Sequence, residues 1–270
     1  MVKTGIVCGC LPTQAGIEKP AMYHQVIATE ILRQTGVVLQ VSSTWYTTIA
    51  ESKFKTISLI EKEKPEIILY HVRPDPYLKL CKLIIRYSDS QRQFHLMLNR
   101  NADDSKLLEQ RYEPRNSIAR KEHSFLKKML RNFNLLAGLV LRINKKAIRR
   151  ELNMLNEISA YCRDQSIFLI LIGPASRPRS KLENFLLHRL EKILSVKYLT
   201  SPDCYVSCFG THGNAGENLF MDDGVHVSKA GHQRMAQLIF PVMENIIRKH
   251  FIDQTREVNH SDASMLFFNE

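Results

Sequence analysis

The chain has 270 residues, of which 44% are hydrophobic and 24% are charged; this is the composition of a globular protein with a core of its own. No apolar run reaches the roughly 18 residues of a membrane span, and the N-terminal apolar run is typical of a first strand rather than of an export signal. Six cysteines are too few for a disulfide scaffold, so free thiols are expected. Together these features predict a cytoplasmic protein.

The net charge of +11 is concentrated in one segment. Between Arg115 and Arg150, eleven Lys or Arg residues stand against a single acid, Glu122. Such a local basic patch is typical either of a solvated helix face or of a site for an acidic partner, such as a carrier protein, a phosphate-bearing substrate or a membrane surface. The chain has no zinc-finger spacing, RNP-like motif or helix-turn-helix signature, which argues against nucleic acid.

Short apolar runs alternate with helical patterns in the first part of the chain. Residues 4–9, 37–41 and 66–72 predict three buried strands. A first helix is expected to carry an apolar face and to stop at Gly36, and a second helix is expected to bury Phe54, Ile57 and Ile60. Continuous apolar strands that alternate with helices are typical of a parallel sheet covered on both faces.

The alternation stops after the third strand. Residues 76–140 predict only helices, so we interpret them as a helical insertion over the site. The order then resumes with strands at 166–173 and 203–209 and a last helix capped by Ser228. The prediction is a single domain over residues 1–251, a three-layer α/β/α sandwich with five parallel strands, followed by a polar tail at 252–270.

Ligands in such a sheet bind beyond the carboxyl ends of the strands. Four stretches are expected there: "GCLPTQAG" after the first strand, "SSTWYTT" after the second, "RPDP" after the third, and "DDGVH" before the last helix.

The last of these stretches carries a family resemblance. "DGVHVSKAGHQRMAQLI" resembles the C-terminal block of the SGNH (GDSL-type) hydrolases, in which Asp-x-x-His precedes the last helix. "KPEIILYHVRP" is similar to that family's third block, and the order of elements agrees outside the insertion. The resemblance implies ester hydrolysis or acyl transfer without a cofactor, with His226 as general base and Asp223 as the carboxylate that orients it. An imidazole suits this role because it titrates near neutrality. The alternative is that Asp222 or Asp223 caps the helix and that His226 is a surface residue.

The other family blocks are replaced. Where the family has Gly-Asp-Ser, this chain has Gly9 followed by Cys10 and Leu11, so the candidate nucleophiles are Cys10 and Thr13. The alternative for Cys10, which the frequent burial of cysteine favours, is a small buried residue at a strand end.

The family's oxyanion glycine and asparagine are absent as well. Gly9, Ser42 and Ser43 remain as candidate donors to an oxyanion or a substrate. Arg73 is a candidate anchor for an anion, or else forms a salt bridge with Asp75 or with the insertion.

Two functional hypotheses follow. The first is a hydrolase or acyltransferase that acts on an ester or thioester of a small or carrier-bound substrate with an altered nucleophile. The second is a non-catalytic binding or scaffold protein that has kept the fold. The spacing of Cys204, Cys208 and His212 does not fit a zinc site, so no metal is expected.

Overall fold

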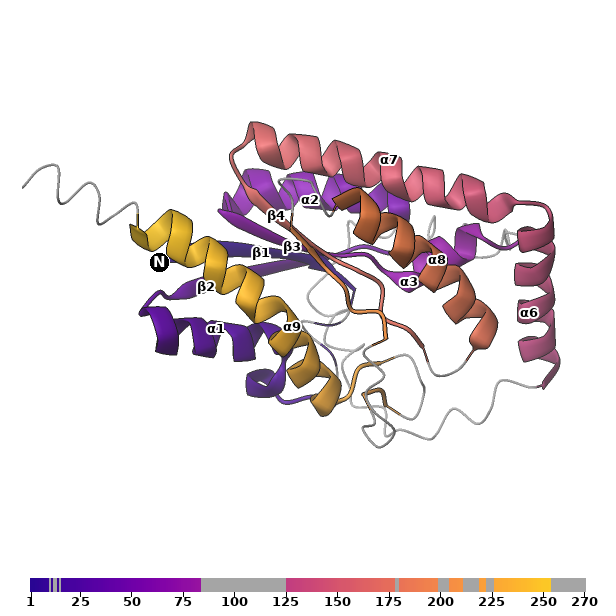
Figure 1. The fold of residues 1–270 in the computed structure, drawn as a ribbon, viewed down its shortest axis with the longest axis horizontal. Coiled ribbons are helices and arrows are strands. Elements are labelled where there is room, and N and C mark those ends of the chain that lie inside the picture. The colour runs from indigo at the N-terminus through magenta and orange to yellow at the C-terminus, as the bar shows by residue number, and fades with distance from the viewer. Residues whose placement is uncertain are drawn as a thin grey trace, which may run out of the picture.

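The computed structural model describes residues 1–9, 11, 14, 16–83, 125–177, 180–198, 204–210, 219–221 and 226–253. The strands form one parallel sheet in the order β2-β1-β3-β4-β5 (Figure 1). They are β1 (Val2–Cys8), β2 (Leu39–Trp45), β3 (Ile67–His71), β4 (Phe168–Ile172) and β5 (Cys204–Val206). The predicted five-stranded parallel sheet is confirmed.

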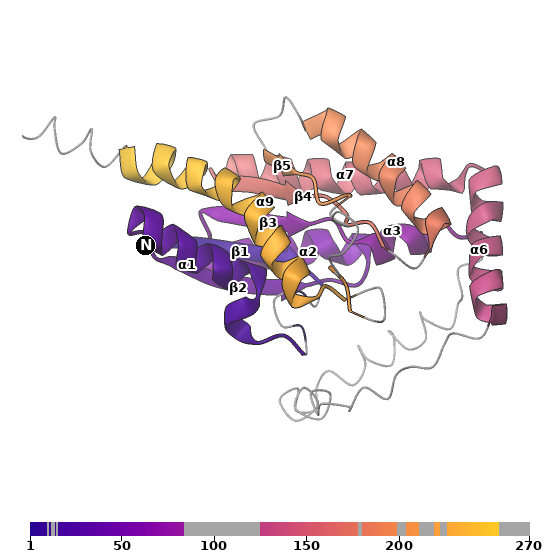
Figure 2. The same cartoon turned by 60° about the horizontal axis from the view of Figure 1, so that its bottom comes forward.

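Helices cover both faces of the sheet. One face packs against α1 (Tyr23–Thr35) and α9 (Lys229–Ile247), and the other against α2 (Ile49–Glu63), α7 (Ile143–Asp164) and α8 (Lys181–Tyr198) (Figures 1 and 2). Helices α3 (Pro74–Leu80) and α6 (Phe125–Val140) lie beyond the carboxyl ends of the strands (Figure 1). Two short turns, η2 (Lys19–Ala21) and η3 (Arg248–Ile252), complete the described elements. The predicted three-layer sandwich is therefore confirmed.

Local sequence signals decide several helix ends. Gly36 ends α1 in the left-handed conformation, with φ of 70°, and its N–H donates to the Leu32 carbonyl oxygen, as expected for a residue without a Cβ. Ser228 precedes α9, and its hydroxyl accepts a hydrogen bond from the Gly231 N–H at 3.2 Å. Both positions confirm the predicted stop and cap.

The predicted face of α2 is confirmed only in part. Ile60 is buried and Ile57 is partly buried, but Phe54 is 69% exposed. The rest of the buried face includes Ser52, Thr56 and Leu59. The hydroxyls of Ser52 and Thr56 donate to carbonyl oxygens of their own helix at 2.6 and 2.7 Å. Because these short side chains satisfy their polar groups locally, they are compatible with burial against the sheet.

The second strand also differs from its prediction, since it starts later and continues through Trp45. It lies at the edge of the sheet and pairs along its whole length with β1, from Val2–Leu39 to Cys8–Trp45. A half-exposed edge strand accommodates polar residues, so the serines that favoured a loop are part of the strand.

Two predicted boundaries fall largely outside the described residues. Of the insertion predicted over 76–140, the described parts are helical in α3 and α6, whereas residues 84–124 lie outside the described ranges. Residues 254–270 of the predicted tail also lie outside them. In the described portion of the chain, no helix is both long and apolar enough to cross a bilayer.

A cluster of three histidines surrounds Tyr23 in the core between α1, α9 and the sheet. The ring centroids of His24, His71 and His232 lie 5.5, 5.2 and 6.1 Å from that of Tyr23. All three histidines are buried, and Tyr23 and His232 are fully so. Burial, followed by repulsion from neighbouring imidazoles, lowers the pKa of His71 to about 3 and that of His232 to about 4, while burial alone lowers the pKa of His24. The folded protein therefore holds these imidazoles neutral.

We expect this cluster to make the fold sensitive to acid. Below the ordinary histidine pKa of 6.5, the unfolded chain binds protons that the folded core excludes, so the free energy of unfolding falls as pH falls. The slope is up to ~1.4 kcal/mol per pH unit for each such histidine between about pH 6.5 and 4. Urea unfolding across this range measures it.

The variant His232→Asn should flatten that slope, because the amide can still accept the hydrogen bond that the Tyr23 N–H donates to the imidazole but cannot be protonated. The exposed His188 is the matched control, and His188→Gln should leave the slope unchanged. The comparison is made between variants because Glu151, buried on the other face of the sheet, has its pKa raised to about 8 by burial and contributes a slope of opposite sign. An unaltered slope in His232→Asn would contradict the assignment.

Candidate functional site

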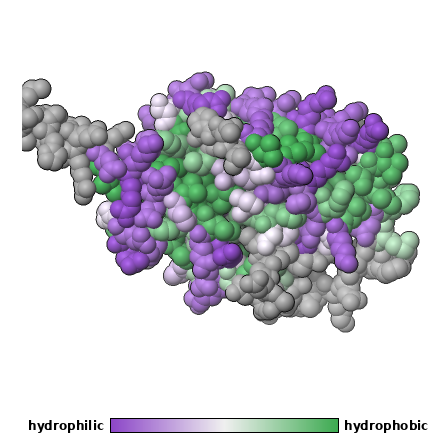
Figure 3. Space-filling model, in the orientation of Figure 1, coloured by the Kyte–Doolittle hydropathy of each residue, from purple (hydrophilic) through white to green (hydrophobic). Residues whose placement is uncertain are grey.

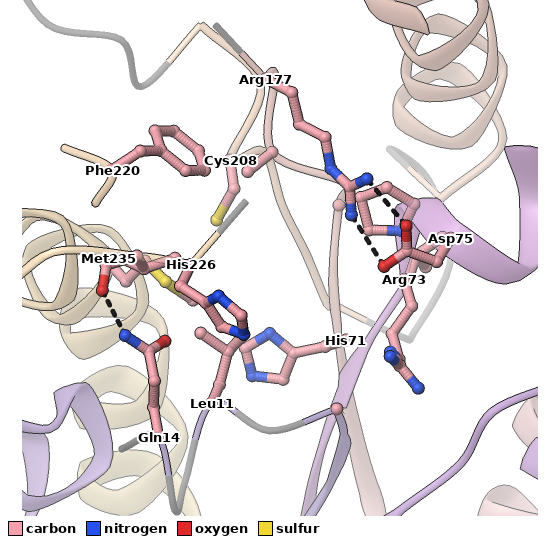
Figure 4. A pocket seen from close by; sticks show the side chains of 16 residues that line it. Leu11, Gln14, His71, Arg73, Asp75, Arg177, Cys208, Phe220, His226 and Met235 are labelled. Carbon is pink, nitrogen blue, oxygen red and sulfur yellow. Dashed lines mark hydrogen bonds and ion pairs between the residues drawn. The ribbon is translucent and has the colours of Figure 1, made fainter. Parts of the chain in front are cut away.

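A pocket lies beyond the carboxyl ends of the strands, as expected for a parallel sheet. Its volume is about 110 Å³, which is room for several water molecules or a small acyl group, since one water occupies about 10–15 Å³ on the same measure. The pocket is lined by Gly9, Leu11, Gln14, His71, Val72, Arg73, Pro74, Asp75, Gly173, Ala175, Arg177, Cys208, Phe220, His226, Val227 and Met235. Figure 4 shows the polar side chains among them.

Three of the four predicted stretches reach this pocket. The segments after β1 and β3 and the segment before α9 contribute lining residues, whereas the stretch after β2 contributes none. Lining residues that were not predicted follow β4 and β5, among them Arg177 and Cys208.

His226 is held in the pocket wall by backbone pairing. Phe220 and Val227 form an antiparallel bridge, and the Met221 N–H donates to the His226 carbonyl oxygen at 2.8 Å. The Gln14 side-chain amide donates to the Val227 carbonyl oxygen at 2.5 Å, which ties the same segment to the residues after β1. The backbone at His226 and Val227 is therefore fixed on two sides.

A second imidazole lies beside it. His71 is the last residue of β3, is 5% exposed, and lines the pocket next to His226 (Figure 4). Its Nε2 lies 2.7 Å from the Tyr23 hydroxyl. Sequence analysis missed His71 because it was included in an apolar strand. The available signal was a titratable residue that ends such a strand, at the edge of the sheet where ligands bind.

Arg73 packs against the turn after β1. A Cβ at Gly9 would lie 2.7 Å from Nε and 2.9 Å from Cζ of Arg73, so only glycine leaves room for this guanidinium. On its other side, the Arg73 Cζ lies 5.4 Å from the centroid of the buried Tyr46 ring. The hydroxyl of Tyr46 accepts from the Arg73 N–H at 3.2 Å and donates to the His71 carbonyl oxygen at 2.7 Å. The Tyr46 hydroxyl therefore holds the backbone of both His71 and Arg73 at the pocket.

The two arginines of the pocket differ in their electrostatic partners. Arg177 is buried and donates two hydrogen bonds to Asp75, at 2.8 and 2.9 Å (Figure 4). The alternative of a salt bridge between Arg73 and Asp75 is therefore wrong. Within the described ranges, no acidic side chain pairs with Arg73, and its buried Nη1 has no hydrogen-bond partner. The described residues thus leave the positive charge of Arg73 at the pocket uncompensated.

Some of the predicted site residues line the pocket and others do not. Gly9, Arg73 and His226 line the pocket together. Ser42 and Ser43 lie within β2, where they pair with Gly5 and Ile6 of β1, so their expected position in a loop at the site is wrong.

The predicted nucleophiles Cys10 and Thr13 and the predicted carboxylate Asp223 lie outside the described residues, as does His212. Their roles stay predictions. Among the described residues, no three His, Cys, Asp or Glu side chains are grouped so as to hold a metal ion.

The cysteine that does line the pocket is a poor nucleophile. Cys208 is 2% exposed, and burial, with the charge of Glu191 adding to it, raises its pKa to about 12. The thiol stays protonated near neutral pH, and it is the thiolate that reacts.

No protein-family model matches the sequence, and no curated protein matches it. Solved structures do resemble it. A catalytic mutant of Axe2, an acetylxylan esterase from Geobacillus stearothermophilus, has a TM-score of 0.54 at 10% identity, with 89% of this chain and 93% of that one covered. A proposed lipolytic protein of the G-D-S-L family from Desulfitobacterium hafniense DCB-2 has a TM-score of 0.52 at 8% identity, covering 90% and 99%. The lipase/acylhydrolase from Enterococcus faecalis has a TM-score of 0.50 at 11% identity, covering 91% and 96%.

At these identities the likeness is one of fold, and it extends over most of each chain. The last sequence block and the three-layer architecture agree with it. The chain therefore has, with a divergent sequence, the fold of the SGNH (GDSL-type) hydrolases.

Proposed function

We propose that the protein hydrolyses an ester or thioester, or transfers its acyl group, with His226 as the general base. The observation that carries this proposal is the position of His226: it lines a pocket at the carboxyl ends of the strands and is held there by the Phe220–Val227 bridge. In the proposed reaction His226 takes the proton of the attacking nucleophile and returns it to the leaving group. Asp223 orients the imidazole.

The proposed nucleophile is Cys10, with Thr13 as the alternative. Both follow Gly9 in the sequence, and Gly9 lines the pocket. Attack on the substrate carbonyl forms a bond to sulfur or oxygen and expels the alcohol or thiol, which takes the proton from His226. Water or an acceptor hydroxyl then attacks the acyl-enzyme, and His226 removes its proton.

We expect His226→Ala to lower kcat on reactive acetyl esters and thioesters by about 10²-fold or more, because the proton acceptor is lost. The matched control is His188→Ala, which removes an exposed histidine and should leave kcat unchanged. Cys10→Ala and Thr13→Ala, assayed on the same substrates, identify the nucleophile. If the kcat of His226→Ala equalled that of the wild type, the mechanism would be excluded.

Thiol labelling provides a second readout in the same experiment. The described cysteines are buried, except for the partly buried Cys204, so an activated Cys10 should react first with iodoacetamide. Its reaction should slow in His226→Ala. The absence of any turnover together with equal labelling would favour the non-catalytic binding protein.

We further propose that Arg73 binds an anionic group of the substrate. Arg73 lines the pocket, and the described residues give its guanidinium no acidic partner. A succinyl ester, which carries a free carboxylate, should therefore have a lower KM than the acetyl ester of the same alcohol. Charge-assisted hydrogen bonds contribute about 1.5–3 kcal/mol.

Arg73→Gln should accordingly raise the KM of the succinyl ester by about tenfold or more and change that of the acetyl ester little. Gly9→Ala should act in the same direction, because its Cβ displaces the guanidinium. Arg234→Gln, a substitution of an exposed arginine, is the control. Equal KM values for the two esters in wild type would contradict the assignment.

The basic surface supports a proposal about carrier-bound substrates. Arg142, Lys145, Lys146, Arg149 and Arg150 are exposed along the start of α7. Next to them α6 exposes apolar side chains, namely Met129, Leu130, Phe133, Leu136 and Val140 (Figure 3). We propose that this surface docks an acidic carrier protein that presents a phosphopantetheine thioester.

Binding of an acidic acyl carrier protein should weaken severalfold when the salt concentration rises from about 50 to 300 mM, because exposed charge pairs are screened over this range. Replacing Lys145 and Lys146 with Glu should weaken it at low salt, whereas the control pair Lys19→Glu and Lys249→Glu should not. Calorimetry measures both. Binding that is unchanged by salt would count against the docking proposal and leave the catalytic one intact.

A further inference from the structure

The hydrogen bond between Tyr23 and His71 determines which nitrogen of His71 carries the proton. The Tyr23 ring is fully buried, and burial raises the pKa of its hydroxyl well above the ordinary value, so the hydroxyl keeps its proton. Among the described residues, the nitrogen or oxygen partner of this hydroxyl is Nε2 of His71, at 2.7 Å. A buried hydroxyl that fails to donate is costly, so Tyr23 donates and Nε2 accepts.

The proton of a neutral His71 must then reside on Nδ1, because a neutral imidazole carries one proton and Nε2 is acting as an acceptor. Burial and the nearby His232 and His24 keep the ring neutral, with its pKa lowered to about 3. His71 is thus unable to act as a general acid near neutral pH, and it offers one N–H donor whose protonation does not change across the working range of the protein.

That donor lies on the pocket side. His71 lines the pocket although it is 5% exposed, and its ring lies beside that of His226 (Figure 4). Tyr23 occupies Nε2 from the side of α1, so Nδ1 is the nitrogen left for a ligand. The sequence lacks the glycine and asparagine that the family resemblance implies for oxyanion binding. A neutral donor fixed before the reaction can serve the same purpose.

We propose that His71 donates a hydrogen bond from Nδ1 to the carbonyl oxygen of the substrate and that Tyr23 is the positioning residue that fixes this tautomer. The donor strengthens its hydrogen bond as negative charge develops on the oxygen and keeps its proton throughout. This assignment rests on the proposed acyl-transfer function for its role in catalysis, whereas the tautomer itself is a property of the resting protein.

The first test is spectroscopic. Two-bond ¹H–¹⁵N correlation spectra of the resting protein should show His71 as the Nδ1–H tautomer at pH 7, and Tyr23→Phe should shift it toward a mixture or toward Nε2–H. Titration with acetate, the product acid of an acetyl ester, should move the His71 Nδ1–H proton downfield. An Nε2–H tautomer in wild type, or no movement at saturating acetate, overturns the proposal.

The second test uses two amides that reproduce different nitrogens of the ring. In His71→Asn the amide nitrogen can occupy the place of Nδ1, whereas in His71→Gln it reaches toward that of Nε2. His71→Gln should lose about 10²–10³-fold in kcat, which is the effect of removing one oxyanion donor, with KM changed little. His71→Asn should retain more activity than His71→Gln.

His232→Asn is the matched control, because His232 packs on Tyr23 without lining the pocket. It should preserve both kcat and the His71 tautomer. Equal kcat in His71→Asn and His71→Gln would overturn the donor role of Nδ1. If no ester or thioester is turned over while the acetate shift is present, the proposed function fails and the donor assignment stands.

Discussion

All five strands of the sheet run in one direction, and the remaining features of the site depend on this constraint. A parallel sheet brings every strand's carboxyl end to the same edge, and each crossover must return the chain to the opposite edge. The segments after β1, β3, β4 and β5 consequently end around one pocket, although they are separated by up to some two hundred residues of sequence. The helices on both faces exclude water from the strands, so polar side chains that end them lie in partly desolvated surroundings.

Two imidazoles share that pocket in different environments. His226 lies next to the Phe220–Val227 bridge at the pocket wall and is only partly buried. His71 ends a strand inside the core and bonds to Tyr23, with two more histidines around the same ring. Burial keeps His71 neutral, whereas His226 is the ring to which the proposed function assigns proton transfer.

The two arginines of the pocket also differ, because only one of them has an acidic partner among the described residues. Asp75 neutralises Arg177 through two hydrogen bonds, which holds the segment after β4 against the start of α3. Arg73 is instead supported by the face of Tyr46 and by the absence of a side chain at Gly9. A ring face stabilises a guanidinium without cancelling its charge. The pocket keeps one cation whose described surroundings do not compensate it, and this asymmetry underlies the proposed preference for anionic acyl groups.

The sequence by itself determined the parallel sheet, the caps at Gly36 and Ser228, the fold family and three of the segments that reach the pocket. These features depend on apolar runs, helix-terminal residues and a short motif, all of which are local. The positions of Ser42 and Ser43 were mispredicted, because a half-exposed edge strand tolerates serines and is distinguished from a loop only by its pairing with β1. His71 and the Arg177–Asp75 pair were missed for a related reason. Tyr23 lies 48 residues before His71, and Asp75 lies 102 residues before Arg177. Only the tertiary structure decided these partners, since burial, tautomer and charge compensation depend on neighbours that packing brings together and that no local pattern encodes.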